Sequence, residues 1–200
     1  MIDRFYPVVP SAEWVARLVP AGARFVQLRI KDQPEAELRR QVRDAQAVCA
    51  RHGAALIVND YWRIAIDEKC PWVHLGQEDL VDADVAAIRR AGLKLGVSTH
   101  DHAELDRGLA VDPDYVALGP VYPTLLKKMP FAPQGLDRLG EWKRLIGKRP
   151  LVAIGGLTVE RARLCLAAGA DSAAVVGDIV NHTDPLGQTK SWLAATRAAA

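Results

Sequence analysis

The chain has 200 residues, half of them hydrophobic, which is enough to bury a large core. Its 26 Lys and Arg residues nearly balance its 24 Asp and Glu residues, which leaves a formal net charge of +2. So small a charge attracts neither nucleic acid nor an anionic membrane to the chain as a whole. We therefore expect no nucleic-acid and no membrane partner, and any anion site must be local.

The cysteines and the start of the chain indicate the compartment. Cys49, Cys70 and Cys165 are widely spaced and fit neither a disulfide framework nor metal-ligand spacing. The opening MIDRFYPVVP lacks the pattern of a signal peptide, and no run of apolar residues is long enough to span a membrane. We expect a reduced, cytoplasmic protein.

Short apolar runs recur along the chain, and each is followed by a longer stretch with helical periodicity, as in repeated βα units. The predicted strands cover residues 5–9, 25–29, 55–59, 72–75, 94–98, 115–118, 151–154 and 173–176. The predicted helices cover residues 11–21, 35–52, 61–69, 82–91, 101–111, 136–147, 158–168 and about 186–199.

Repeated units of this kind predict an α/β fold, a (β/α)₈ TIM barrel whose parallel strands are buried on both faces. We expect one barrel domain that spans residues 1–200. The alternative is a doubly wound open sheet, which normally carries a glycine-rich phosphate motif after its first strand. Here the first strand is followed by PSAEW, which contains no glycine.

Polar residues follow the predicted strands, and in a barrel these positions meet at one mouth. Gln27, Arg29 and Lys31 alternate along the second strand, so they should project into one space. Asp60 and Asp79 follow the third and fourth strands, close enough in barrel order to share Mg²⁺. The alternatives are ion-paired barrel filling for the two cations, a helix N-cap for Asp60 and a turn cap for Asp79.

The pair Gly155-Gly156 follows the seventh strand and predicts a phosphate cradle of backbone N–H groups. The helix that starts near Thr158 would complete this cradle with its N-terminus. His74 and His100 also follow strands, but neither lies beside an evident nucleophile, so we interpret both as structural.

The stretch 118–135, LGPVYPTLLKKMPFAPQG, shows neither helical nor alternating periodicity. A loop this long inside a compact domain is usually a lid, a binding loop or a disordered segment. Its Lys127-Lys128 pair and its apolar residues favour a lid or binding loop over a solvated surface excursion.

In order, the motifs QLRIKD, VNDYWRIAI, VHLGQEDL, GVSTHD, LGPVYPT-x-x-K, APQGL and VAIGGL resemble those of the thiamine-phosphate synthase family. The resemblance runs from about Tyr6 to Ile179. It implies a (β/α)₈ transferase that condenses hydroxymethylpyrimidine diphosphate with thiazole phosphate or its carboxylate. The products would be thiamine phosphate, pyrophosphate and, from the carboxylate form, CO₂. The partners would be these small molecules, and the cofactor would be Mg²⁺.

The resemblance also implies which residues hold the pyrimidine diphosphate. They are Gln27, Arg29, Lys31, Asn59, Ser98 and Lys127. Of these, Arg29, Lys31 and Lys127 would be catalytic, because their charges would neutralise the departing pyrophosphate. Tyr6 is expected to face the pyrimidine ring.

Further roles follow from the same resemblance. Asp60 and Asp79 would bind Mg²⁺. The thiazole phosphate would be received by Thr124, Gly156 and the backbone of Val176 and Gly177.

The chain departs from the family pattern on the thiazole-phosphate side. Leu126 and Gly177 each replace a residue that usually carries a hydroxyl, and Asp178 stands where a small apolar residue is common. Two alternatives therefore stay open: a relative that isomerises the thiazole carboxylate, and a catalytically silent protein that binds the pyrimidine diphosphate. The oligomeric state also stays open, a homo-oligomer included.

Overall fold

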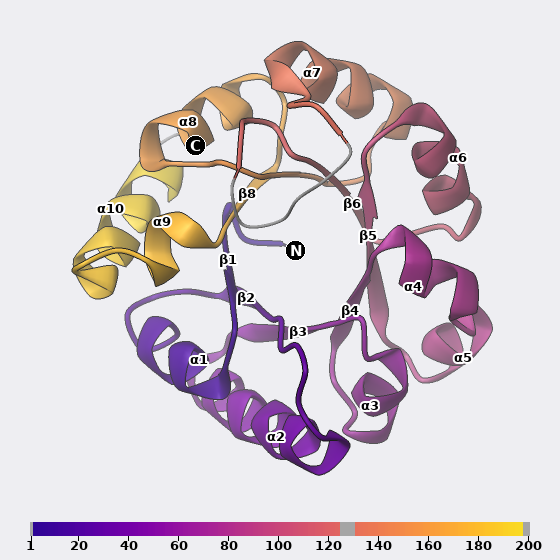
Figure 1. The fold of residues 1–200 in the computed structure, drawn as a ribbon, viewed down its shortest axis with the longest axis vertical. Helices are drawn as coiled ribbons and strands as arrows, with labels where there is room; N and C mark the ends of the chain where they lie inside the picture. The colour runs from indigo at the N-terminus through magenta and orange to yellow at the C-terminus, as the bar shows by residue number, and fades with distance from the viewer. Residues whose placement is uncertain (1, 125–130, 198–200) are drawn as a thin grey trace.

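The computed structural model describes residues 2–124 and 131–197. Within them, eight parallel strands close into a barrel in sequence order, which confirms the predicted TIM barrel (Figure 1). The barrel closes where Phe5, Tyr6 and Pro7 of the first strand pair with Ala173, Ala174 and Val175 of the last. The strands are β1 (Phe5–Val9), β2 (Phe25–Leu28), β3 (Ala55–Asn59), β4 (Trp72–Leu75), β5 (Lys94–Thr99), β6 (Tyr115–Leu118), β7 (Leu151–Ile154) and β8 (Ser172–Val175).

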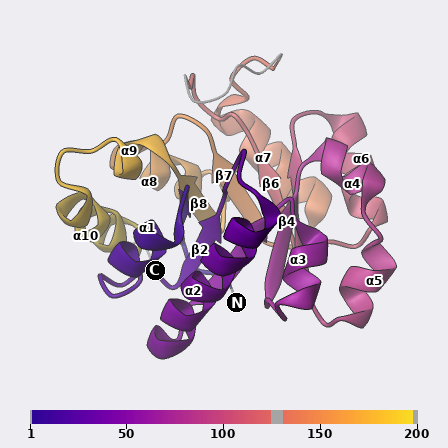
Figure 2. The ribbon, with the colours of Figure 1, turned by 60° about the horizontal axis from the view of Figure 1, so that its bottom comes forward.

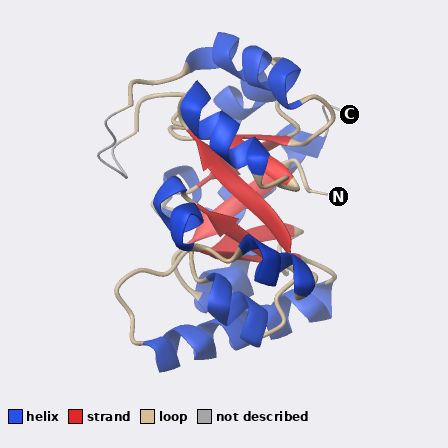
Figure 3. Cartoon of the chain, turned by 90° about the vertical axis from the view of Figure 1, so that its right-hand side faces the viewer, coloured by secondary structure: helices blue, strands red, loops and turns tan. Residues whose placement is uncertain are grey.

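Helices surround the barrel, and side views show the strands enclosed between them (Figures 2 and 3). They are α1 (Ala12–Leu18), α2 (Glu35–His52), α3 (Trp62–Asp67), α4 (Gln77–Asp82), α5 (Val85–Arg90), α6 (His102–Ala110), α7 (Gly135–Ile146), α8 (Val159–Ala167), α9 (Gly177–Val180) and α10 (Pro185–Arg197). Over the described part of the chain, every helix is too short or too polar to cross a lipid bilayer.

Local sequence explains several helix ends. The side chains of Ser11, Asp101 and Thr158 accept hydrogen bonds from backbone N–H groups in the first turns of α1, α6 and α8. Gly53 ends α2 with a left-handed φ of 62°, a conformation that glycine adopts without a Cβ penalty. These signals are local in sequence, so the predicted bounds of α2, residues 35–52, agree with the structure.

The structure differs from the predicted elements between β4 and β5 and after β8. The predicted helix over residues 82–91 is the shorter α5, and the helix α4 that precedes it was not predicted; Ala83, whose backbone is extended, and Asp84 lie between them. Asp84 starts the second helix by accepting a hydrogen bond from the backbone N–H of Ala87. The short helix α9 was not predicted, because four residues are too few to show a helical period.

The core has a shell between the strands and the helices and a cluster inside the barrel. Aromatic rings fill much of the interior: Phe25 packs edge-to-face on Trp72 with ring centroids 5.1 Å apart, and Tyr115 lies 5.8 Å from Trp72. Rings of this size fill the barrel with side chains rather than leaving a pore. Chemistry is therefore confined to the strand ends.

Candidate active site

The residues at the end of β2 alternate between the core and the barrel mouth. Gln27 is 4% exposed inside the barrel, Ile30 is buried in the outer core, and Arg29 and Lys31 are exposed. The strand-like path continues past Leu28, since the backbone N–H of Arg29 donates to the carbonyl oxygen of Val9 at 2.8 Å. The structure thus places an amide and two cations in alternate positions of one segment.

Lys31 pairs with Asp60 across the mouth. Its Nζ lies 2.5 Å from Oδ2 of Asp60, whose side chain is only 14% exposed. Asp60 has a left-handed φ of 66°, which is uncommon for a residue with a Cβ and concentrates at functional sites. The N-cap alternative for Asp60 is wrong, because the cap position of α3 is Tyr61 and no side chain bonds there.

Asp79 faces Asp60 from the first turn of α4. A Cβ atom at Gly76 would lie 3.2 Å from Oδ2 of Asp79, so the carboxyl group lies over the start of its own helix. The pKa of Asp79 is raised, first by burial and then by the negative charge of Asp60 and a hydrogen bond to it, while Lys31 opposes the shift. Two carboxyl groups that share a half-buried space favour a nearby positive charge.

The donor set suits a hard cation. Among the described residues, no group of three or more His, Cys, Asp and Glu side chains could hold a metal ion. A cation held by Asp60 and Asp79 would therefore take its remaining oxygens from water or a substrate. Mg²⁺ has this preference, because it keeps several waters and binds through one or two carboxylates plus phosphates.

Asn59 carries an unused donor next to this pair. It ends β3 and is 5% exposed. Its Nδ2 is the single buried side-chain polar atom without a hydrogen-bond partner among the side chains that the structure describes. Burying an unsatisfied donor costs about 1–3 kcal/mol, so such groups usually have a role. Asn59 thus offers an N–H to a ligand oxygen.

Ser98 is linked to the barrel interior through His74. The Oγ of Ser98 lies 2.8 Å from Nε2 of His74, and Nδ1 of His74 lies 2.8 Å from the hydroxyl of Tyr115. The pKa of His74 is lowered to about 4, chiefly by burial, with the negative charge of Asp60 opposing the shift and the nearby Arg29 adding to it. His74 is therefore neutral near pH 7.

His100 is held by an acid and by the long loop. Its Nδ1 lies 2.6 Å from Glu104, and its ring stacks on Phe131 at 4.6 Å and 6°. Phe131 belongs to the second half of the loop that the sequence predicts to be a lid or a binding loop. The structural interpretation of His100 agrees with these contacts.

The turn after β7 lies close to the loop that follows β6. Gly155 and Gly156 have φ values of 98° and 66°, and a Cβ atom at Gly156 would lie 2.4 Å from the carbonyl oxygen of Pro123. Arg161 donates to the carbonyl oxygen of Gly156 at 2.6 Å and lies over the ring of Tyr122 at 4.6 Å. The close approach of the loop is therefore one reason why this turn needs glycine.

The remaining loop residues are only partly described. Thr124 lies in the described part and is half-buried. Leu126 and Lys127 lie outside the described residues. The predicted roles of Leu126 and Lys127 therefore stay predictions.

The end of β8 accounts for the unusual Asp178. Val176 precedes α9, which begins at Gly177. Oδ2 of Asp178 accepts hydrogen bonds from Nε2 of Gln188 at 2.6 Å and from Nε1 of Trp192 at 2.7 Å. Its charge is directed to α10, so it has a packing role that the sequence pattern did not reveal.

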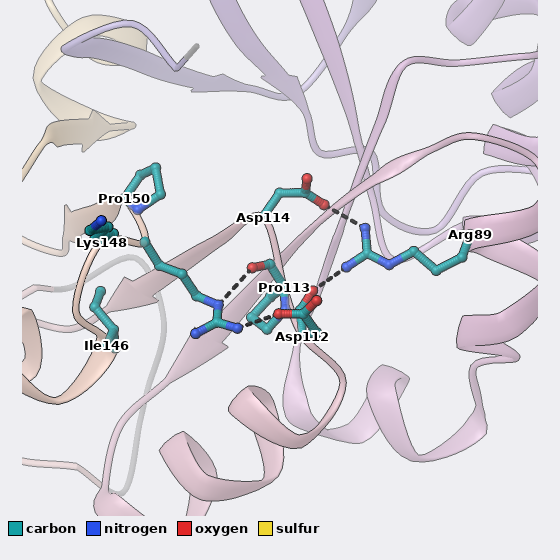
Figure 4. A pocket seen from close by; sticks show the side chains of 8 residues that line it. Arg89, Asp112, Pro113, Asp114, Ile146, Lys148 and Pro150 are labelled. Carbon is teal, nitrogen blue, oxygen red and sulfur yellow. Dashed lines mark hydrogen bonds and ion pairs between the residues drawn. The ribbon is translucent and has the colours of Figure 1, made fainter.

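A surface groove of about 680 Å³ lies at the opposite end of the barrel (Figure 4). Both of its arginines are paired: Arg89 lies 2.5 Å from Asp114, and Arg149 pairs with Asp112 and donates to the carbonyl oxygen of Pro113. This end holds the starts of β6 and β7, and in TIM barrels such positions serve stability rather than catalysis. The candidate site is therefore the mouth at the carboxyl ends of the strands.

Comparison with known proteins decides the family. The family model described as thiamine monophosphate synthase matches residues 5–179. The chain belongs to the thiamine-phosphate synthase family. It is 63% identical to the thiamine-phosphate synthase of Rhizobium etli, with 98% of this chain and 96% of that protein covered. It is 53% identical to the thiamine-phosphate synthase of Cronobacter sakazakii, with 94% and 90% covered.

A solved structure of the thiamine-phosphate synthase family gives the same result for the fold. Thiamine phosphate pyrophosphorylase from Pyrococcus furiosus superposes with a TM-score of 0.87 at 26% identity, over 98% of this chain and 96% of that one. The chain is thus an enzyme of thiamine biosynthesis, a transferase built on a TIM barrel.

Proposed function

We propose that the protein joins hydroxymethylpyrimidine diphosphate to thiazole phosphate, or to its carboxylate, and releases pyrophosphate together with, from the carboxylate form, CO₂. The observation that carries this proposal is the cluster at the mouth, in which Lys31, Asp60 and Asp79 lie together beside the unsatisfied amide of Asn59. Cations, paired carboxyls and a free N–H group are what a metal-bound diphosphate requires.

Asp60 and Asp79 would hold Mg²⁺. When bound, the metal would supply positive charge that stabilises the departing pyrophosphate. Arg29 would present its planar fork to two phosphate oxygens. Lys31 is 47% exposed and lies at the same mouth, so it can exchange its partner Asp60 for a phosphate oxygen.

The reaction proposed is a dissociative substitution. The bond between the exocyclic methylene carbon and the diphosphate oxygen breaks, and pyrophosphate leaves with the electron pair. The electron-rich aminopyrimidine carries the resulting positive charge until the thiazole nitrogen attacks the methylene carbon. No protein nucleophile is required, so Arg29, Lys31 and Lys127 act by position and charge, and Asn59 donates to the leaving group.

The thiazole phosphate would bind beside the β7 and β8 strand ends. Thr124, Gly156 and the Val176-Gly177 backbone are the proposed contacts, and the N-terminus of α8 supports an anion there. The side chain of Asp178 is bonded to α10, which removes one argument for a protein that has lost thiazole-phosphate binding.

We also propose that the protein works in a reducing cytoplasm. Cys49, Cys70 and Cys165 are free and buried, and burial raises the pKa of each thiol to about 12. A buried thiol with a raised pKa is a poor nucleophile, and none of the three cysteines forms a disulfide.

The decisive experiment is turnover by the purified protein with Mg²⁺ and both substrates, followed by chromatography of the products. The proposal predicts thiamine phosphate and pyrophosphate in equal amounts. Isomerised thiazole carboxylate without thiamine phosphate would favour the relative that only isomerises. Binding of pyrimidine diphosphate without either product would favour the silent protein.

A further inference from the structure

A continuous chain of hydrogen bonds crosses the barrel interior beneath the charged mouth. Gln27 Nε2 donates to the hydroxyl of Tyr6 at 2.7 Å, and that hydroxyl lies 2.8 Å from the hydroxyl of Tyr115. The Tyr115 hydroxyl lies 2.8 Å from Nδ1 of His74, and Nε2 of His74 lies 2.8 Å from Oγ of Ser98. This hydrogen-bond chain thus joins Gln27 and Ser98, two residues expected at the pyrimidine. It runs through Tyr6, which is itself expected to face the ring, and through Tyr115 and His74, which have no assigned role in the chemistry.

Counting protons fixes the direction of this chain. The Gln27 amide N–H donates to Tyr6, so the single hydroxyl proton of Tyr6 must go to Tyr115. The proton of Tyr115 must then go to Nδ1 of His74. The neutral imidazole therefore carries its proton on Nε2 and donates it to Ser98.

A charged imidazole would break the chain. If His74 carried protons on both nitrogens, Tyr115 would have to donate to Tyr6, and the buried hydroxyl proton of Tyr6 would have no acceptor. Burial acts in the same direction, because it lowers the pKa of His74 to about 4.

The two ends of the hydrogen-bond chain offer opposite groups to a ligand: a donor at Ser98 and an acceptor at Gln27. Ser98 accepts from His74 and keeps its own O–H free to donate toward a ligand. Gln27 uses its N–H inside the barrel, and its amide oxygen, which has no hydrogen bond to a described residue, is free to accept. An aminopyrimidine has the complementary pattern, with an amino group that donates and ring nitrogens that accept.

We propose that Tyr6, Tyr115 and His74 are positioning residues that fix Gln27 as an acceptor and Ser98 as a donor toward the pyrimidine ring. The identity of the ring rests on the proposed function, whereas the direction of the hydrogen-bond chain rests on the orientation of the Gln27 amide, whose N–H donates to Tyr6. An aromatic ring of reversed hydrogen-bonding pattern would meet donor against donor and acceptor against acceptor, so the chain sets specificity.

The barrel provides space for the middle of this chain. The strand register places His74 opposite Gly96 and Gly96 opposite Tyr115. A Cβ atom at Gly96 would lie 2.0 Å from Cζ of Tyr115 and 2.4 Å from its hydroxyl oxygen. Because Gly96 has no side chain, the ring of Tyr115 can cross it and reach His74.

The first test reads the imidazole directly. Long-range ¹H–¹⁵N NMR of the histidine-labelled full chain distinguishes the two neutral tautomers, and a His74→Gln variant identifies which of the five histidines gives the signal. The proposal predicts a proton on Nε2 and none on Nδ1. A proton on Nδ1 at neutral pH would overturn it. This reading needs no turnover, so it stands or fails independently of the proposed function.

The second test is a double-mutant cycle on KM for pyrimidine diphosphate. Tyr115→Phe and Ser98→Ala should each raise KM by about 10-fold, the effect of one lost hydrogen bond. If Tyr115 acts through Ser98, the double variant should be no worse than Ser98→Ala. A double variant whose effect is the product of the two single effects, about 100-fold, would overturn the proposal.

A matched control distinguishes the effect of breaking the hydrogen-bond chain from the effect of losing a tyrosine hydroxyl in general. Tyr61 is half-buried, and its hydroxyl has no hydrogen bond to a described residue, so Tyr61→Phe should leave KM and the His74 signal unchanged. If Tyr115→Phe does not fold, the NMR spectrum of the unsubstituted protein still decides the direction of the hydrogen-bond chain.

Discussion

Replacing Asn59 by Leu should make the free protein more stable and the enzyme weaker. Nδ2 of Asn59 is buried without a partner, and the side chain is only 5% exposed. An unsatisfied buried donor costs about 1–3 kcal/mol, and leucine has nearly the same shape without the donor. We therefore expect Asn59→Leu to raise the free energy of unfolding by about 1 kcal/mol. That gain corresponds to about 2–4 °C in Tm for a chain of this size.

The same substitution should weaken the binding of pyrimidine diphosphate. A hydrogen bond to a charged oxygen contributes about 1.5–3 kcal/mol, so its loss should raise Kd by roughly 10- to 100-fold. Thermal unfolding without ligand measures the first effect, and calorimetry with pyrimidine diphosphate measures the second. Asn181→Leu is the control, because Asn181 is exposed and should change the free energy of unfolding by less than about 0.5 kcal/mol.

The opposite pair of results would refute this reasoning. If Asn59→Leu lowers Tm and leaves the affinity for pyrimidine diphosphate unchanged, then the amide of Asn59 has a structural partner. Nδ2 of Asn59 would then have no role in binding pyrimidine diphosphate.

Other substitutions test the remaining parts of the site. Asp79→Ala should lower kcat/KM by about 10²- to 10⁴-fold and weaken its dependence on Mg²⁺; an unchanged Mg²⁺ titration would remove Asp79 from the metal site. Arg29→Lys should raise Kd for pyrimidine diphosphate by at least about 10-fold at unchanged Tm, because lysine cannot bridge two phosphate oxygens; equal affinities in calorimetry would contradict this. Leu126→Thr should tighten thiazole-phosphate binding by about 0.5–1.5 kcal/mol, since it restores a hydroxyl donor; equal affinities would show that position 126 does not face that phosphate. The pKa of His74 is lowered from 6.5 to about 4 by folding, so the stability it confers is present above pH 6.5 and is lost as the pH falls toward 4. Urea unfolding of His74→Gln should lack that loss, on the order of 3 kcal/mol, and an identical pH dependence in both proteins would contradict the assignment.

The strands could be predicted because the barrel buries both of their faces. Residues 5–9, 55–59, 72–75, 115–118 and 151–154 are apolar runs bounded by polar or turn residues, and the structure has strands with these bounds. The helix break at Ala83 could not be predicted in the same way. It depends on one extended residue within a stretch that has helical composition throughout.

The sequence predicts which side chains gather at the mouth but not which contacts they make, and their roles in the site stay predictions. The order of the strands is enough to bring Lys31, Asp60 and Asp79 to one mouth, and the structure shows them interacting. The role of Tyr115 could not be found in this way. It depends on the register between β4, β5 and β6 and on the space above Gly96, which no local pattern encodes.

Asp178 is a residue whose sequence position suggests a role that the structure does not bear out. As a departure from the family pattern it suggests a disturbed thiazole-phosphate site, because it follows β8 directly. In the structure its carboxylate accepts hydrogen bonds from Gln188 and Trp192 of α10. These partners lie ten and fourteen residues further along the chain, so only the packing of α10 reveals its role.

The most direct test of the proposed site is a crystal structure of the protein with Mg²⁺ and a non-reacting analogue of the pyrimidine diphosphate. The proposal predicts the metal between Asp60 and Asp79, a diphosphate oxygen within hydrogen-bond distance of Nδ2 of Asn59, and the pyrimidine ring between Gln27 and Ser98. A diphosphate bound away from Asn59, or a metal held by other residues, would contradict it.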